Sequence, residues 1–169
     1  MTISMYQASA AAFARGLANL AQVLRKGADY AAARKIDERV LLEARLYPDM
    51  LPLAAQVRIA TDFSRRACAR LAGDEPPKWE DDETTFAQLI ARIDRALEVV
   101  RSYTPARIDG SEARKITFPI GGEPKSFTGL DYLLKHVLPN FYFHSVTAYA
   151  ILRHNGVALG KSDYIGALD

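Results

Sequence analysis

Apolar residues recur at helical spacing through most of this chain. In the first stretch they follow one another at steps of four, three and four residues, at Phe13, Leu17, Leu20 and Leu24. Positions spaced in this way share one face of an α-helix. The pattern predicts an amphipathic helix over residues 4–26, with Gly27 as its C-terminal stop.

A second stripe begins after Pro48, which breaks the chain. One helix face carries the inner positions Leu53, Gln56, Ala60, Phe63, Ala67 and Leu71. Another face carries four charged residues that can pair one turn apart, namely Arg58, Asp62, Arg65 and Arg66. Between the two long helices, Asp37 can cap a short helical piece in "DERVLLEARL".

A third helix follows the segment "GDEPPKWEDDET", whose glycine, prolines and acids indicate a linker. The linker is long enough to cross from one end of a bundle to the other, and we expect Trp79 to hold it against the body. The helix is predicted from Thr84 or Thr85 to about Tyr103, because Thr85 and Gln88 have the spacing of a capping box. Its inner positions are Phe86, Leu89, Ile93 and either Ala96 or Leu97.

The period then changes from helical to alternating. "KITFPIGGEPKSF" places β-forming residues on both sides of Gly121 and Gly122, which predicts a small hairpin. Pro119 and Pro124 confine that hairpin to an edge. A fourth helix is predicted over residues 128–154, with Asn155 and Gly156 as its stop. Its inner stripe is Leu130, Leu134, Val137, Phe141, His144, Ala148 and Ile151.

These elements predict an all-α fold. Four long amphipathic helices, with a long crossover between the second and third and a hairpin before the fourth, favour a four-helix bundle. A helical solenoid is the alternative. The 169 residues, 49% of them hydrophobic, supply enough apolar surface for one core, so we expect a single domain over residues 1–169.

Charge and composition narrow the function classes. Lys and Arg number 22 against 20 Asp and Glu, a net charge of +2, and both signs are spread over the helices. A nucleic-acid partner would require a concentrated basic face, so we expect none. No stretch has the length of a membrane span, and the start lacks the features of a signal peptide. The lone Cys68 suits a reducing compartment, and the cytoplasm is the expected location.

The candidate chemistry lies in "HVLPNFYFHSVTAYAILRHNG", which carries His136, His144 and His154. His144 occupies an inner position, with Asn140 one turn earlier and His136 two turns earlier on the same strip. Histidines on one helix face can grip zinc or nickel together with a third ligand from another helix. Here that third ligand is missing, because the second helix has no histidine and Gln56 offers only an amide.

Two interpretations of these histidines follow. In one, His144 and His136 are candidate ligands of an incomplete zinc or nickel site. In the other, His144 is a core histidine hydrogen-bonded to a neighbouring helix, His136 lies at a partly exposed edge, and His154 interacts with the dipole at the helix C-terminus.

Two further features concern the surroundings of these histidines. Pro139 removes a helical hydrogen bond and frees the carbonyl of Lys135, and the resulting kink either shapes a pocket or wraps the helix around the core. The aromatic residues of this helix face more directions than one stripe can absorb, namely Tyr132, Phe141, Tyr142, Phe143 and Tyr149. We expect some of them to meet the hairpin, the linker or a second copy of the chain.

Four segments carry a resemblance to a known family: "ISMYQAS", "YPDMLPLAAQV", "DGSE" and, above all, "PNFYFHSVTAYAILRHNGVALGKSDY". The chain resembles an uncharacterised bacterial domain-of-unknown-function family in the DinB/YfiT-like superfamily, a group associated with metalloenzymes. The resemblance spans nearly the whole chain. It implies a four-helix bundle in up-down-down-up order, commonly dimeric. The superfamily includes metal-dependent transferases and isomerases that use small intracellular thiols.

The resemblance also implies where a metal would be held. In the superfamily, one histidine comes from the second helix and a pair comes from the fourth. The helix-four pair resembles Asn140 and His144 here, so the second histidine is kept and the first is replaced, while the helix-two histidine falls around Ile59. The expected remnant is a polar ligand pocket lined by Gln56, His136, Asn140 and His144.

Two functions therefore follow as hypotheses. The first is a metal-free cytoplasmic homodimer that binds a small molecule or a partner through this remnant cavity. The alternative is a transferase or isomerase acting with a low-molecular-weight thiol. It would use a metal bound through His144, His136 and water, or His144 as a candidate catalytic base without metal.

Overall fold

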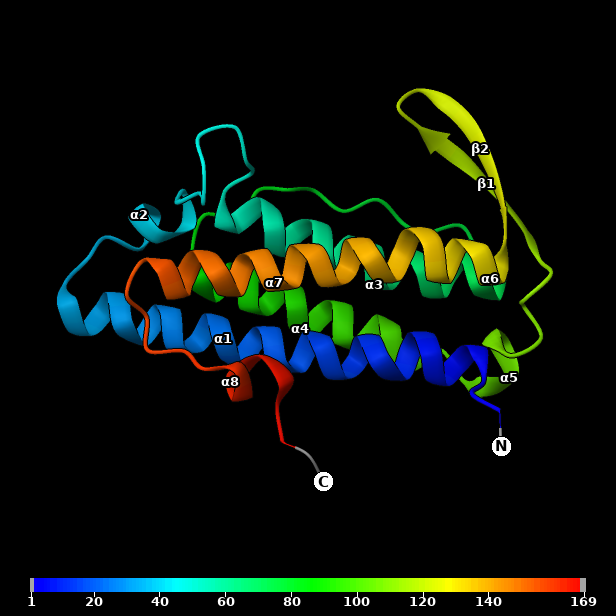
Figure 1. Cartoon of the computed structure of the whole chain (residues 1–169), viewed down its shortest axis with the longest axis horizontal. Helices are drawn as coiled ribbons and strands as arrows, with labels where there is room; N and C mark the ends of the chain where they lie inside the picture. Colours follow the sequence, from blue (N-terminus) through cyan, green and yellow to red (C-terminus); the bar gives the residue numbers. More distant parts are fainter. Residues whose placement is uncertain (1, 168–169) are drawn as a thin grey trace.

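The computed structural model describes residues 2–167 as a bundle of four long helices (Figure 1). These are α1 (Ala12–Arg34), α3 (Leu53–Ala72), α4 (Phe86–Ser102) and α7 (Leu138–His154). Helices α1 and α7 run in one direction and α3 and α4 in the other, which is the up-down-down-up order. The segment between α3 and α4 returns along the length of the bundle, so the predicted crossover is confirmed.

Shorter elements extend or flank the long helices. They are η1 (Gln7–Ala11), α2 (Glu38–Leu42), α5 (Pro105–Ile108), α6 (Gly129–Asp131), η2 (Tyr132–Val137) and α8 (Lys161–Ile165), where η1 and η2 are π-helical segments. The predicted caps form, because the Asp37 carboxylate accepts from the Arg39 amide at 3.0 Å and Thr85 makes a capping box with Gln88. No helix in the described part of the chain is both long and apolar enough to cross a bilayer.

The predicted hairpin consists of β1 (Lys115–Ile120) and β2 (Glu123–Thr128), paired antiparallel as a sheet of two strands. Gly121 and Gly122 form the turn with φ of 60° and 87°, values that favour glycine in a two-residue hairpin. The hairpin stands beside the end of the bundle where α3 ends and α6 begins (Figure 1). Alternation along β1 turns Ile116, Phe118 and Ile120 toward the body.

The prediction that the first helix stops at Gly27 is wrong, because the helix continues to Arg34 and ends at Lys35, whose φ is 54°. Alanine-rich sequence after Gly27 sustains the helix. Gly27 is instead a point of close approach, since a Cβ there would lie 3.1 Å from Leu152 and 3.2 Å from Phe86. The glycine therefore serves packing rather than termination.

The fourth helix also departs from the predicted stripe at its start. Leu130 and Leu134 were expected inside but are 42% and 50% exposed, whereas Tyr132 and Leu133 are 1% and 0% exposed. The cause is η2, whose wider turn rotates the residues before it relative to those after it. From Val137 onward the predicted inner positions lie inside or half-buried.

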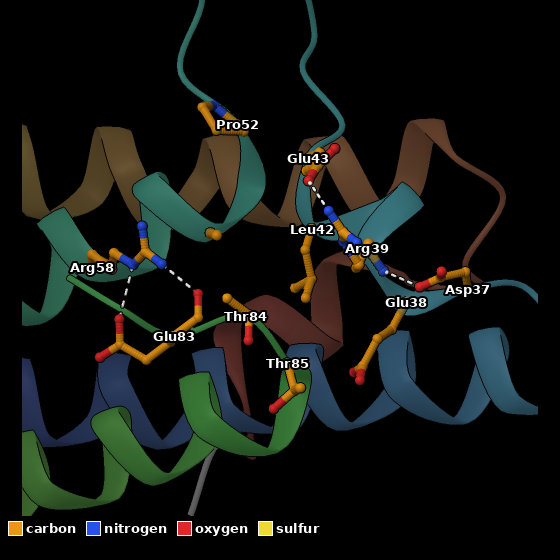
Figure 2. Close-up of a pocket in the computed structure, with 11 residues that line it drawn as sticks. Asp37, Glu38, Arg39, Leu42, Glu43, Pro52, Arg58, Glu83, Thr84 and Thr85 are labelled. Carbon is orange, nitrogen blue, oxygen red and sulfur yellow. Dashed lines mark hydrogen bonds and ion pairs between the residues drawn. The ribbon is translucent and has the colours of Figure 1, made fainter.

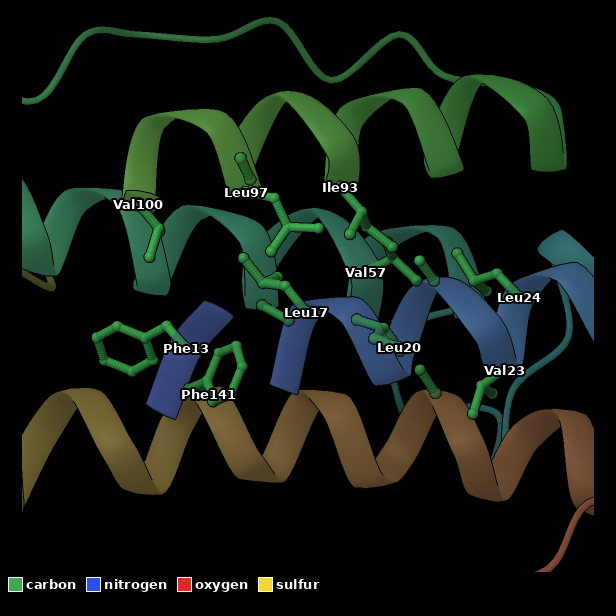
Figure 3. Packing of buried hydrophobic residues seen from close by; sticks show 14 of the residues in the cluster. Phe13, Leu17, Leu20, Val23, Leu24, Val57, Ile93, Leu97, Val100 and Phe141 are labelled. Atoms are coloured by element: carbon green, nitrogen blue, oxygen red, sulfur yellow. The ribbon is translucent and has the colours of Figure 1, made fainter. Parts of the chain in front are cut away.

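The core runs along the bundle axis, and Figure 3 shows its centre, where α1 meets α4 and α7. Phe13 and Phe141 pack edge to face with ring centroids 5.1 Å apart. Both Ala96 and Leu97 are buried, so both of the alternative inner positions predicted for α4 lie in the core. The stripes of all four long helices supply this core.

Trp79 holds the crossover to the body through arginines, as predicted. The guanidinium carbons of Arg65 and Arg95 lie 4.2 Å and 4.0 Å from the centre of the indole. Arg92, with a side chain only 2% exposed, donates to the Glu80 carbonyl at 2.7 Å and to the Glu83 carboxylate at 2.8 Å. Burial alone would raise the pKa of Glu83, but its hydrogen bonds with Arg92 and Arg58 hold that pKa below its usual range.

Candidate functional site

His144 of α7 and Gln56 of α3 face each other between the two helices. The His144 Nδ1 atom lies 2.7 Å from Gln56 Oε1, and Gln56 Nε2 donates to the carbonyl of Leu51 at 2.9 Å. Because the second bond fixes the amide orientation, Gln56 Oε1 is an acceptor and His144 Nδ1 must donate. His144 is therefore the Nδ1–H tautomer, with the lone pair on Nε2. This confirms a histidine hydrogen-bonded to a neighbouring helix.

His136 and Asn140 lie on the same side of the fourth helix, toward α3. Asn140 Nδ2 donates to the carbonyl of His136 at 2.6 Å. Both imidazole rings pack against Phe63 of α3, with centroid distances of 5.3 Å for His136 and 6.2 Å for His144. Burial lowers the pKa of His144, and burial followed by the charge of Arg70 lowers the pKa of His136, so both rings favour the neutral form.

These donors do not fit the metal site that the superfamily implies. His144 could offer one ligand atom, Nε2, because only its Nδ1 atom is hydrogen-bonded to Gln56, but the Asn140 side chain donates to a backbone carbonyl. Ile59 stands where a histidine would be required. Within residues 2–167, no three His, Cys, Asp or Glu side chains gather so that they could hold a metal ion. A borderline metal such as zinc would have too few imidazole or carboxylate ligands here.

His136 lies in a cluster of aromatic rings built by α3, the two strands of the hairpin and η2. Four rings surround its imidazole at centroid distances of 5.3 to 5.9 Å, namely Phe63 of α3, Phe118 of β1, Phe127 of β2 and Tyr132 of η2. Phe118 also packs against Tyr132 at 5.4 Å. The π-helical turn places Tyr132 and His136 together on the side that receives the hairpin, with ring centroids 5.9 Å apart. The hairpin is thereby attached to the bundle.

A cavity of about 390 Å³ opens beside this cluster, between α3, the hairpin and η2. This volume falls in the range of about 300–1,000 Å³ typical of small-molecule sites. Its apolar walls are Ile59, Phe63, Phe118, Pro119 and Ile120, and its polar lining is Asp62, Arg66, Arg70 and His136. Apolar walls with a few convergent polar groups are the usual composition of a ligand pocket.

The charged groups of this cavity differ in how they are paired. The Asp62 carboxylate forms ion pairs with Arg65 at 2.7 Å, with Arg66 at 2.5 Å and with Arg92 at 3.0 Å. Arg70 instead stacks on Phe118, with its guanidinium carbon 4.1 Å from the ring centre, and donates to Tyr132 Oη at 3.0 Å. Three guanidinium groups thus share one carboxylate, while Arg70 is held by aromatic groups.

A larger cavity, of about 530 Å³, lies at the other end of the bundle, where α2 meets the starts of α3 and α4 (Figure 2). Its charges are all engaged. Arg58 binds Glu83 at 2.8 Å and Arg39 pairs with Glu43 at 3.6 Å. Asp37 caps α2, and the Glu38 carboxylate accepts from the Phe86 amide at 2.8 Å. The Glu38 bond ties α2 to the start of α4 and the Arg58 pair ties α3 to the crossover, so we assign this cavity a structural role.

Comparison with known proteins places this geometry in a family. A family model described as "Domain of unknown function (DUF1993)" matches residues 5–165. The chain belongs to the DUF1993 family. This DUF1993 chain is also similar to a DinB family member protein from Shewanella denitrificans, whose crystal structure shares 38% identity and a TM-score of 0.88. The match covers 96% of this chain and 92% of that chain. A search of curated proteins gave no match.

The DUF1993 fold brings together only part of the predicted site. Gln56 contacts His144, and Asn140 contacts the His136 backbone. Of the four predicted pocket residues, His136 lines the cavity, and Gln56, Asn140 and His144 do not. Sequence reasoning missed Arg70 and Phe118. Alternation in the hairpin could have placed Phe118 on the inner face, but its contact with Arg70 depends on how the hairpin docks.

Proposed function

We propose that this DUF1993 protein is a cytoplasmic, metal-free homodimer that binds a small molecule in the cavity beside His136. The observation that carries the proposal is the cavity itself, whose apolar walls enclose His136 and two arginines. Small-molecule sites have this composition. The lone Cys68 is buried, and burial raises the pKa of its thiol to about 12, which suits a thiol kept as packing in a reducing compartment.

Metal analysis tests the metal-free part. We expect protein purified without a histidine tag, with and without zinc or nickel supplementation, to hold no stoichiometric metal by elemental mass spectrometry. The donor set supports this expectation, since Asn140 and Ile59 stand where two of the superfamily's histidine ligands would lie, which leaves His144 Nε2 with too few partner ligands. One equivalent of metal that is lost in His144→Ala but kept in His154→Ala would overturn it. That result would favour the thiol-dependent transferase or isomerase instead.

A neutral aromatic probe tests the cavity. We expect phenylacetamide to shift the NMR signals of the His136 ring in a saturable manner, because that ring lines the cavity. The exposed His154 ring is the internal reference. Ile59→Trp, which fills the cavity from its α3 wall, should abolish the shift while the protein stays folded. If His136 is unmoved in the original protein, the cavity is not a ligand site.

The outer side of α7 supports the homodimer. Tyr142, Phe143 and Val146 lie there within little more than one helical turn and are 42%, 55% and 45% exposed. Residues 138–152 contain no Asp, Glu, Lys or Arg, so nothing on this stretch would select a charged partner. An uncharged apolar helix face is complementary to the same face of a second copy in a two-fold dimer.

A further inference from the structure

We infer that the ligand of the cavity beside His136 is a small organic anion with a flat apolar body, and that Arg70 binds its anionic group. This inference rests on the proposed function, because it names the chemical class of the ligand for the same cavity. Arg70 differs from the other arginines of α3, each of which forms an ion pair with a carboxylate.

Arg70 is presented to the cavity in a fixed orientation. Its guanidinium stacks on Phe118 at 4.1 Å, and the same group lies 5.8 Å from the Tyr132 ring centre. The side chain donates to Tyr132 Oη at 3.0 Å. Within residues 2–167, Arg70 makes no ion pair and no other side-chain hydrogen bond. A guanidinium has five N–H donors in a planar fork that matches a carboxylate, so most of them stay available to a ligand.

Asp74, the acid one helical turn after Arg70, pairs with another arginine. Asp74 stands four residues after Arg70, the spacing of a helical ion pair, but Gly73 ends α3 with φ of 85°. Asp74 therefore leaves the helix and receives Arg107 on both carboxylate oxygens, at 2.8 Å and 2.9 Å. Glu75 lines a neighbouring depression together with Arg70 and Asp74, and that depression also contains Arg114 and Lys115. Basic groups therefore accompany both of these acids.

The cavity as a whole favours negative charge. Its lining holds Arg66 and Arg70 against one carboxylate, Asp62, which Arg65 and Arg92 also bind from outside the lining. Burial, and then the charge of Arg70, lower the pKa of His136, so its ring is neutral near pH 7 and adds no charge to the cavity. The cavity near α2 differs, because each of its charged residues already has a partner. A charge-assisted bond from Arg70 would complete the pairing only when an anion is bound.

The remaining walls select the body of the ligand. Phe63 and Phe118 present aromatic surface, and Ile59 and Ile120 present aliphatic surface. Such walls gain most from a flat apolar group, which can stack on the rings without burying polar atoms. A phenyl ring that carries a carboxylate on a short arm has both required parts.

Three probes of matched size and different charge test this inference: phenylacetate, phenylacetamide and phenethylamine. Titration calorimetry, with the His136 ring signals as the locator, should show phenylacetate binding at least about tenfold more tightly than phenylacetamide, because only the carboxylate can form a charge-assisted hydrogen bond with Arg70. Phenethylamine should bind most weakly. Added salt should weaken phenylacetate binding more than phenylacetamide binding.

Two substitutions locate the effect. Arg70→Met should bring phenylacetate to the affinity of phenylacetamide, and Arg70→Lys should retain part of the difference. Arg25→Gln, which removes an exposed ion pair with Asp94 outside the cavity, is the matched control and should leave both affinities unchanged. Equal binding of the two probes, or a preference for phenylacetate that survives Arg70→Met, would overturn the anion inference while the cavity remains a ligand site. No binding of any probe at His136 would overturn both proposals.

Discussion

His144 and His136 show how burial sets the behaviour of individual side chains. Each is half-buried against α3 and has a lowered pKa, for His144 because of burial and for His136 because of burial and then Arg70. A folded-state pKa below the unfolded value means that the unfolded chain binds protons first as the pH falls. The neutral histidines are thus compatible with the fold, and their protonated forms oppose it.

This difference predicts a pH dependence of stability. The free energy of unfolding should be level just above neutral pH and should fall as the pH drops below the ordinary histidine value of 6.5. The loss should level off once the pH passes the folded-state values. Urea unfolding at a series of pH values measures it. The double variant His136→Phe, His144→Gln should flatten the profile in this window, and His154→Gln should not. An equal slope in all three proteins would contradict the assignment.

Gly129 is a position where one added carbon atom should destabilise the fold. It begins α6, and a Cβ there would overlap the backbone carbonyl oxygen of Ser111, which cannot move like the end of a flexible side chain. Gly129→Ala should therefore cost about 1–3 kcal/mol in the free energy of unfolding. Gly160→Ala is the control, because the added Cβ would lie 3.7 Å from Ser162 Oγ, an ordinary van der Waals distance. Similar small effects of both substitutions in urea unfolding would refute this.

At the level of elements, the crossover between α3 and α4 depends on buried charge. Arg92 reaches from α4 to Thr61 at 2.9 Å, to Asp62 at 3.0 Å and to Glu83 at 2.8 Å. Arg92 thus connects α4, α3 and the crossover through one guanidinium. Hydrophobic packing holds the helices together elsewhere, but here an extended segment is held by hydrogen bonds to charged groups.

Removing that guanidinium should release the crossover. Arg92→Ala leaves Asp62 and Glu83 with fewer partners in a partly buried place and should cost about 3–5 kcal/mol. Arg95→Ala removes only an exposed stacking contact on Trp79 and should cost about 0.5–1 kcal/mol. Chemical unfolding gives both values, and limited proteolysis should show faster cleavage in residues 73–85 for Arg92→Ala alone. Equal cleavage of the two variants would show that Arg92 does not hold the segment.

Contacts between elements also explain why the predicted inner stripe is wrong at the start of the fourth helix. The spacing of Leu130 and Leu134 matched a regular α-helix, yet η2 inserts a wider turn and buries Tyr132 and Leu133 instead. No local signal distinguishes these alternatives, because both registers place apolar residues inside. Packing of the hairpin favours the observed register, since Phe118 and Phe127 pack on Tyr132 and His136.

For the whole molecule, the apolar outer face of α7 predicts association. If a second copy covers Tyr142, Phe143 and Val146, light scattering after size-exclusion chromatography should give twice the chain mass of 18.7 kDa. Val146→Asp places a charge in that interface and should yield the monomer. Val40→Asp, at an exposed apolar position of α2, is the control and should stay dimeric. A monomer in the unaltered protein would contradict the proposed homodimer.

Much of the architecture followed from the sequence, because it rests on local rules. Period 3.6 located the four long helices, Thr85 and Gln88 marked a helix start, and Gly121 and Gly122 marked the hairpin turn. The same rules gave a wrong helix end at Gly27, since a glycine that stops a helix and one that lets two helices approach look alike in sequence.

The candidate site was less predictable, because it is made between elements. The sequence by itself determined that Gln56 and His144 occupy inner faces and that an Ile stands at position 59, where a metal ligand would be needed. Only the tertiary structure decided that Gln56 binds His144, that the cavity lies beside His136, and that Arg70 faces Phe118 rather than Asp74. Helical spacing fixes which side a residue faces, whereas its partner depends on how separate elements dock.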